Sequence, residues 1–126
     1  MAIDKSIRVL VVDDFATMRR ILKGVLKQLG FGNIVEADDG AIALQELKKE
    51  KVGLIVSDWN MPNMNGLDLL KEVRGDDNLK DIPFLMVTAE GQKENVVRAV
   101  QAGVSNYIVK PFTPETFSAK LEKVFG

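Results

Sequence analysis

The chain has 126 residues, carries 17 Lys and Arg against 18 Asp and Glu, and contains no histidine and no cysteine. The length suits one domain, and the two missing residue types exclude a cysteine nucleophile, a disulfide framework, a Cys/His zinc site and a Ser-His-Asp triad. The balanced charge argues against a broad nucleic-acid-binding surface. No apolar run reaches the length of a signal peptide or membrane span, so we expect a cytoplasmic protein without membrane partners.

Short apolar runs recur along the chain and predict strands. They cover residues 7–12, 33–37, 54–56, 84–87 and 107–109. Near-continuous apolar runs rich in β-branched residues are typical of parallel strands that are buried on both faces. The run at 33–37 is the most polar of the five, which suits an edge strand.

Helical periodicity fills the stretches between these runs. Apolar stripes that predict helices begin at Met18, Ala41, Leu67, Val96 and Phe117. Gly30 and Gly103 follow the first and fourth stripes as helix stops, and Thr113-Pro114 is a typical start for the fifth helix.

Five strand–helix units with short connections predict an α/β fold with a parallel sheet covered on both faces. The expected architecture is the flavodoxin-like, doubly wound (βα)5 arrangement, with a five-stranded sheet in the order 2-1-3-4-5. Ligands of such folds bind outside the carboxyl ends of the strands, near the switch point between strands 1 and 3. The residues at those ends are therefore the candidate site.

The predicted strands end in Asp13-Asp14, Ser57-Asp58, Thr88 and Lys110. Each has an ordinary structural interpretation: Asp13 and Asp14 as helix caps, Asp58 as a turn residue, Thr88 as structural and Lys110 as a solvated charge. The combination is more specific than its members. Three carboxylates packed together repel one another, and a hard divalent cation such as Mg²⁺ relieves that repulsion.

Four segments, Val11–Asp14, Asp58–Pro62, Thr88–Glu90 and Lys110–Phe112, resemble the receiver domain of bacterial two-component response regulators. The resemblance covers essentially the whole chain. Segments Asp13–Phe15, Thr17–Arg20, Ser57–Met64 and Ser105–Tyr107 resemble the single-domain chemotaxis regulators within that family. The resemblance implies one receiver domain over residues 1–126 with no output domain, acting as a signalling protein rather than an enzyme.

The resemblance also implies roles at the strand ends. Asp58 would accept the phosphoryl group, and Lys110 would neutralise charge that grows on it during transfer. Asp14 would bind Mg²⁺ directly and Asp13 through a water molecule, together with the Asp58 carboxylate and the backbone carbonyl of Asn60. The donor would be a phosphohistidine on a CheA-type histidine kinase, because this chain has no histidine of its own.

Output is implied by the same resemblance. The Thr88 hydroxyl would move to the phosphoryl group and Tyr107 would rotate inward, so that the chain, acting as a monomer, binds the flagellar motor switch protein FliM and controls rotation. Candidate contact residues are Lys93, Val96, Tyr107 and Lys120. Gly91-Gln92 departs from the Ala-Lys that is frequent in the family, which removes one positive charge near this surface. A dedicated phosphatase as a further partner is left open, and so is the choice between cis and trans for the Lys110-Pro111 bond, although the resemblance favours cis more than the base rate does.

Three other functions remain as alternatives. A Mg²⁺-dependent phosphatase of the haloacid dehalogenase type is weakened because the second Asp of Asp13–Thr17 falls one residue early and the chain lacks room for a cap domain. A flavin carrier is weakened because Asp13 and Asp14 would repel its phosphate. A receiver-like module that is never phosphorylated is weakened by the intact set of strand-end residues.

Overall fold

The structure is a computed structural model that describes residues 3–89 and 93–125. Its centre is a five-stranded parallel sheet with the strand order β2-β1-β3-β4-β5, which confirms the predicted fold class. The strands are β1 (Arg8–Val12), β2 (Asn33–Ala37), β3 (Leu54–Asp58), β4 (Phe84–Thr88) and β5 (Asn106–Val109). This order places β1 beside β3, so the switch point falls where the sequence predicts it.

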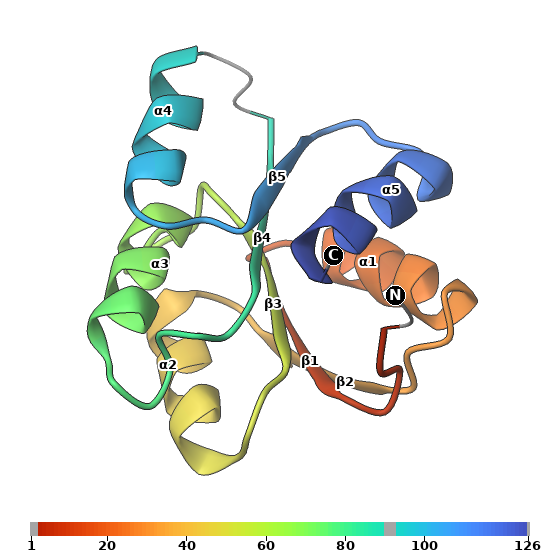
Figure 1. Cartoon of the computed structure of the whole chain (residues 1–126), viewed down its shortest axis with the longest axis horizontal. Helices are drawn as coiled ribbons and strands as arrows, with labels where there is room; N and C mark the ends of the chain where they lie inside the picture. The colour runs from red at the N-terminus through yellow and green to blue at the C-terminus, as the bar shows by residue number, and fades with distance from the viewer. Residues whose placement is uncertain (1–2, 90–92, 126) are drawn as a thin grey trace.

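Five helices cover the two faces of the sheet. They are α1 (Ala16–Gln28), α2 (Gly40–Lys49), α3 (Gly66–Gly75), α4 (Lys93–Gln101) and α5 (Pro114–Phe125). Figure 1 shows α1 and α5 together on one side of the sheet and α2, α3 and α4 on the other. The molecule is therefore a three-layer sandwich, as short right-handed βαβ connections require.

Burial along the strands follows from that layering. β3 and β4 are buried at every position, whereas the more polar β2 is exposed or half-buried at four of its five residues, as expected for an edge strand. In β1, Leu10 and Val12 pack in the core beneath α2 and α3, while Val9 and Val11 pack in the core beneath α1 and α5. Each fully buried side chain of this size favours folding by about 1.5–3 kcal/mol.

The predicted helix ends have the expected local chemistry. Asp39 caps α2 by accepting from the N–H of Ile42 at 3.0 Å, and Thr113 Oγ1 accepts from the N–H of Thr116 at 3.1 Å before α5. Gly30 and Gly103, which follow α1 and α4, have φ angles of 101° and 92°. Within residues 3–89 and 93–125, no helix is long and apolar enough to cross a membrane.

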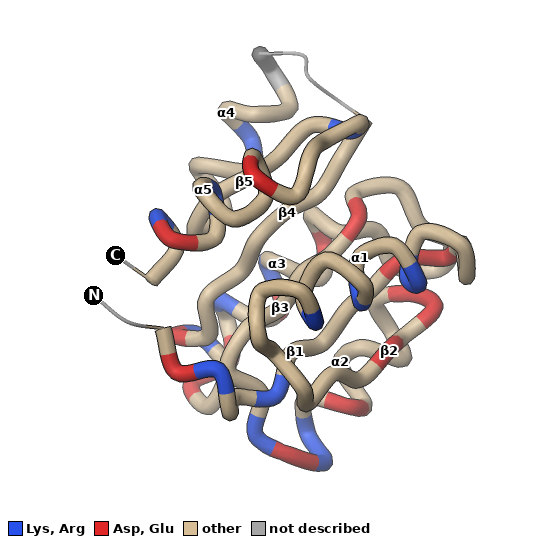
Figure 2. Tube along the Cα trace, turned by 90° about the vertical axis from the view of Figure 1, so that its right-hand side faces the viewer, with Lys and Arg blue, Asp and Glu red and all other residues tan. Residues whose placement is uncertain are grey.

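Charge is distributed over the fold rather than gathered on one element. Figure 2 shows basic and acidic positions interspersed along most of the trace. This distribution agrees with the formal net charge of −1.

Candidate phosphoacceptor and metal site

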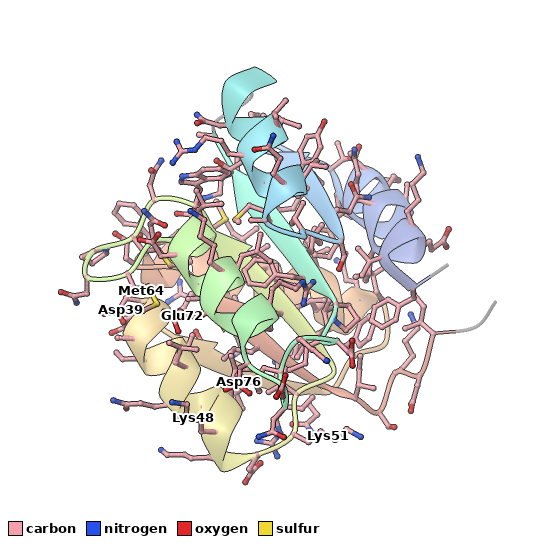
Figure 3. All side chains as sticks on the ribbon, turned by 60° about the vertical axis from the view of Figure 1, so that its left-hand side comes forward. Asp39, Lys48, Lys51, Met64, Glu72 and Asp76 are labelled. Atoms are coloured by element: carbon pink, nitrogen blue, oxygen red, sulfur yellow. The ribbon has the colours of Figure 1, made fainter. Side chains whose placement is uncertain are left out.

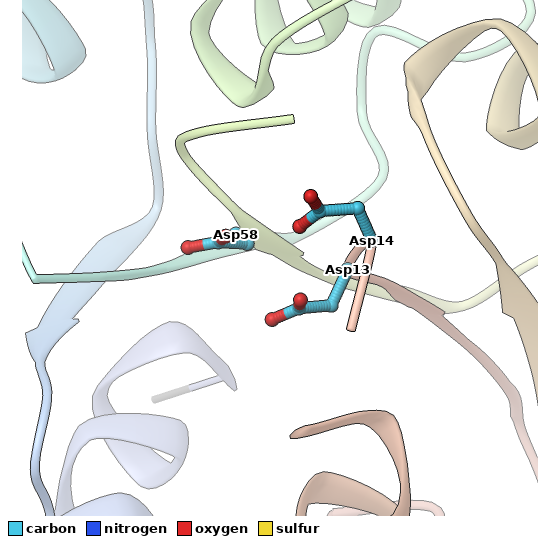
Figure 4. Close-up of side chains that lie close together, drawn as sticks. All are labelled: Asp13, Asp14 and Asp58. Carbon is cyan, nitrogen blue, oxygen red and sulfur yellow. The ribbon is translucent and has the colours of Figure 1, made fainter. Parts of the chain in front are cut away.

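Parallel pairing brings three carboxylates together at the carboxyl ends of β1 and β3. Val12 pairs with Ser57, so the residues that follow them, Asp13 and Asp58, lie side by side. The carboxylate oxygens of Asp13, Asp14 and Asp58 include a set that lies within 4.8 Å of one another. Figure 4 shows the three side chains close together at this edge of the sheet.

Asp13 is held rigidly and does not cap α1. The N-cap residue of α1 is Phe15, whose own side chain makes no cap hydrogen bond, so Asp13 and Asp14 are not the helix caps that the structural interpretation expects. Asp13 Oδ1 instead accepts from the N–H of Phe15 at 2.9 Å, and Arg19 donates to the Asp13 carbonyl oxygen at 2.7 Å. The local turn thereby aims the fully buried Asp13 carboxylate at the site.

Lys110 supplies the positive charge of the site. Its Nζ donates to Asp58 Oδ1 at 3.2 Å and to Asp13 Oδ2 at 3.4 Å. The backbone of Lys110 is fixed by its N–H, which donates to the Thr88 carbonyl oxygen at 2.8 Å, and the Lys110-Pro111 bond, whose state the sequence leaves open, is cis. The side chain therefore reaches the site from the end of β5, across the end of β4.

The pKa of Asp58 is raised above its usual value. Burial is the main cause, since only 5% of the residue is exposed and desolvation penalises the charged form. The Lys110 ammonium opposes this rise in the pKa, and the neighbouring Asp13 carboxylate adds to it. A divalent cation in the site would favour the ionised carboxylate, which is the form that can act as a nucleophile.

Asp14 gives an independent indication that a cation fits here. Its Oδ1 is buried and has no hydrogen-bond partner in the described part of the chain. A buried carboxylate oxygen without a partner is costly, and a metal ion would satisfy it. Three carboxylates that leave room for water are the donor set that Mg²⁺ favours. The residues present therefore fit a magnesium ion.

Two contributors to the site are not apparent from sequence reasoning. In the sequence, Arg19 is only one residue of the segment Thr17–Arg20. Its hydrogen bond to the Asp13 carbonyl oxygen depends on how α1 packs beside β1. Gly66 reads as a helix start, yet a Cβ at this position would overlap the Asp58 carbonyl oxygen and lie 2.9 Å from Met86 Sδ. The pair Asn65-Gly66 indicates a turn before a helix, but it does not predict that Gly66 approaches the Asp58 backbone closely.

Comparison with known proteins agrees with this geometry. A family model described as the response regulator receiver domain matches residues 9–122. The chain belongs to this family.

Relatives within the family are chemotaxis proteins. The chain is 54% identical to the chemotaxis protein CheY-3 of Vibrio cholerae serotype O1 over 98% of this chain and 95% of the relative. It is 52% identical to the chemotaxis protein CheY of Pseudomonas aeruginosa, covering 94% and 95% of the two chains. The solved chemotaxis response regulator CheY4 of Vibrio cholerae is 35% identical, with a TM-score of 0.86 over 94% of this chain and 98% of that one. This receiver domain is therefore similar to chemotaxis regulators of two-component systems, a class of signalling proteins.

The predicted switch residues of this receiver domain lie along one gap. Thr88 is buried at the end of β4 and Tyr107 is half-buried in the adjacent β5. Both line a gap that is too narrow for a water molecule, together with Trp59, Val96 and Ala99. Side-chain movement at Thr88 can therefore change the space that is open to Tyr107.

The predicted partner surface is described in part. Val96 borders the same gap from α4, and Lys120 Nζ lies 4.9 Å from the centre of the Tyr107 ring. The Lys93 side chain and Gly91-Gln92 lie outside the described residues. The Asn60 side chain is exposed, and the structure gives no contact that tests its carbonyl as a metal ligand.

One hollow of this receiver domain lies away from these residues. It has a volume of about 530 Å³ and is lined by Lys48, Lys51, Asp76 and neighbouring apolar residues at the amino ends of the strands. Figure 3 shows these three residues below Met64, in the lower part of the view. The acidic cluster shares no residue with this hollow, because it lies at the carboxyl ends of the strands.

Proposed function

We propose that the chain is a phosphorylation-activated chemotaxis response regulator that accepts a phosphoryl group on Asp58 in a Mg²⁺-dependent reaction. The observation that supports this most strongly is the contact of Lys110 Nζ with Asp58 Oδ1 at 3.2 Å, next to a partner-free oxygen of Asp14. A buried acceptor, one cation and a vacant carboxylate oxygen form a set that phosphoryl transfer needs.

Transfer to Asp58 requires one bond to form and one to break. An Asp58 carboxylate oxygen attacks the phosphorus of a phosphohistidine, the P–N bond breaks, and the histidine nitrogen keeps the bonding electrons and takes up a proton. The product is an acyl phosphate on Asp58. Lys110 stabilises the charge on the transferred oxygens, because its Nζ lies within 3.4 Å of both Asp58 and Asp13.

Four residues would hold the metal in this proposal. Asp14 Oδ1 and the Asp58 carboxylate would bind it directly, Asp13 would bind through water, and the Asn60 backbone carbonyl would complete the protein ligands. When bound, Mg²⁺ supplies positive charge that offsets the negative charge of the phosphoryl group. Mg²⁺ usually keeps several water ligands, and phosphoryl oxygens would replace some of them.

Output in this proposal passes through Thr88 and Tyr107. Phosphorylation favours the state in which the Thr88 hydroxyl contacts the phosphoryl group and Tyr107 packs inward. A tenfold shift in population needs about 1.4 kcal/mol, roughly one charge-assisted hydrogen bond. The altered surface, with Lys93, Val96, Tyr107 and Lys120, would then bind the flagellar motor switch protein FliM.

The signalling context is part of the same proposal. A CheA-type histidine kinase supplies the phosphoryl group, and residues 1–126 act as one cytoplasmic, monomeric receiver domain. We propose signalling through a protein partner rather than enzymatic turnover of external substrate. The family match and the chemotaxis relatives at 52–54% identity support this context.

The experiment that tests the function is phosphorylation by a small donor. The chain is incubated with Mg²⁺ and phosphoramidate, and its intact mass is measured. We expect a gain of one phosphate in the unaltered chain and in the control Asp77→Asn, whose carboxylate is exposed. We expect no gain in Asp58→Asn or when Mg²⁺ is removed with EDTA. Multiple turnover of a phosphate ester would instead favour the phosphatase alternative.

A further inference from the structure

The loop at residues 59–65, between β3 and α3, contacts the start of α2. Asn63 Nδ2 donates to Asp39 Oδ2 at 2.8 Å, and the Gly40 N–H donates to the Met64 carbonyl oxygen at 3.2 Å. Figure 3 shows Asp39 and Met64 next to each other where these segments meet. We refer to the contact of Asp39 and Gly40 with Asn63 and Met64 as the loop clamp.

Asp39 is fully engaged by this clamp. It is 6% exposed, and its two carboxylate oxygens have different partners. Oδ1 accepts from the Ile42 N–H and caps α2, while Oδ2 accepts from Asn63. The Asn63 bond, followed by the Ile42 bond, holds the pKa of Asp39 below its usual value. One buried carboxylate thus joins the start of a helix to a distant loop.

The backbone on both sides of the clamp fits this contact closely. A Cβ at Gly40 would lie 2.7 Å from Met64 Cγ, so only glycine permits the approach. Asn63 has a φ of 65°, which is uncommon outside glycine and which asparagine tolerates best among the larger residues. The unusual turn at Asn63 is therefore fixed by a side-chain bond rather than by local preference alone.

A second hydrogen bond fixes the other end of the loop. The Gly66 N–H donates to the Trp59 carbonyl oxygen at 2.8 Å. Asn60 follows Trp59 directly and is separated from Asn63 by only two residues. The segment that includes Asn60 is therefore held between two fixed points, one beside Asp58 and the other on α2.

We propose that Asp39 is a positioning residue for the magnesium site, because it fixes through Asn63 the backbone that presents the Asn60 carbonyl. This inference rests on the proposed function, in which that carbonyl binds Mg²⁺. Groups that orient metal ligands commonly change metal affinity by about 10-fold to 100-fold when they are altered. Asp39 would act through the loop and would not touch the metal itself.

The first test replaces the bond partner while keeping the helix cap. Asp39→Asn retains an oxygen that can accept from Ile42, and Asn caps helices as well as Asp does. Its amide can bond Asn63 only if the Asn63 amide turns over, and the charge-assisted bond from Asn63 to a carboxylate is lost in either case. We expect Mg²⁺ affinity to fall about tenfold, as measured by calorimetry and by Trp59 fluorescence without any phosphodonor.

A swapped pair separates positioning from general stability. In Asp39→Asn with Asn63→Asp, donor and acceptor exchange places and the net charge is unchanged, so we expect most of the Mg²⁺ affinity to return. Asn63→Gly keeps the left-handed turn without the amide donor and should weaken Mg²⁺ binding like the first variant. Val52→Ala, buried before β3 at the far end of the sheet, should lower stability but keep Mg²⁺ affinity within about twofold.

The outcomes distinguish this inference from the proposed function. If the unaltered chain binds Mg²⁺ and both Asp39→Asn and Asn63→Gly bind it equally well, the positioning role is overturned and the proposed function stands. A loss in Asp39→Asn that the swapped pair fails to restore, and that Val52→Ala reproduces, also overturns it. Absence of Mg²⁺ binding in the unaltered chain contradicts the metal site and this inference together.

Discussion

At the scale of single residues, the site depends on charges that oppose one another in a small space. Lys110 contacts Asp58 and Asp13, whose carboxylates would otherwise face each other without a cation. Burial still raises the pKa of Asp58, so Lys110 alone does not offset the cost of its charge. The buried position of Asp58 in the site therefore lowers the stability of the folded chain.

The sign of this cost predicts a pH dependence. Because the folded-state pKa of Asp58 lies above the unfolded value of about 3.8, the folded chain holds the Asp58 proton more tightly than the unfolded chain does. Ionised Asp58 therefore lowers the free energy of unfolding above the folded-state pKa, and this cost vanishes below the unfolded one.

Asp58→Asn should consequently be more stable than the unaltered chain at pH 7 in EDTA, by about 1 kcal/mol, the gain often seen when a strained functional site is relieved. The gain should shrink as the pH falls through the folded-state pKa toward 3.8. Urea unfolding at several pH values measures it. A difference that is absent at pH 7, or that grows in acid, would contradict the burial argument.

Lys110→Ala tests the link between the site and the output surface. The variant should fold normally, because Lys110 lies at the half-exposed end of β5 and not in the core. It should lose the coupling between phosphorylation and FliM binding, since the Lys110 ammonium is no longer there to contact the phosphoryl group. Binding of FliM to the phosphorylated and unphosphorylated variant measures the coupling. Unchanged coupling would remove Lys110 from the mechanism.

At the scale of elements, position in the sheet determines most of the site. The sequence alone predicts the strands, the helices and the convergence of Asp13, Asp58, Thr88 and Lys110, because strand ends of a parallel sheet meet at one edge. Contacts between loops and helices are harder to foresee. The approach of Gly66 to Asp58 and the bond from Arg19 to Asp13 depend on packing angles that no local pattern encodes.

Gly66 provides a test at this scale. Gly66→Ala places a Cβ against the Asp58 carbonyl oxygen and 2.9 Å from Met86 Sδ, so α3 must shift. We expect a loss of about 1–3 kcal/mol in the free energy of unfolding. Gly75→Ala, at the other end of α3, meets no atom within 4 Å and should be neutral or slightly stabilising. Equal stability of the two variants would refute the close approach.

At the scale of the whole molecule, the layers separate the chemistry from the far end of the sheet. The acidic cluster, the narrow gap of Thr88 and Tyr107, and the loop clamp all lie where the strands end. The hollow of about 530 Å³ lies at the opposite end and shares no residue with them. The absence of histidine from the chain is consistent with the proposed relay, because the phosphohistidine of that relay belongs to another protein.

Phosphoryl transfer to Asp58 is the step on which the proposed signalling depends. It is measured by the intact mass of the chain after incubation with phosphoramidate and Mg²⁺. We expect one added phosphate in the unaltered chain and none in Asp58→Asn. An unmodified chain under these conditions, or equal labelling of Asp58→Asn, would contradict it.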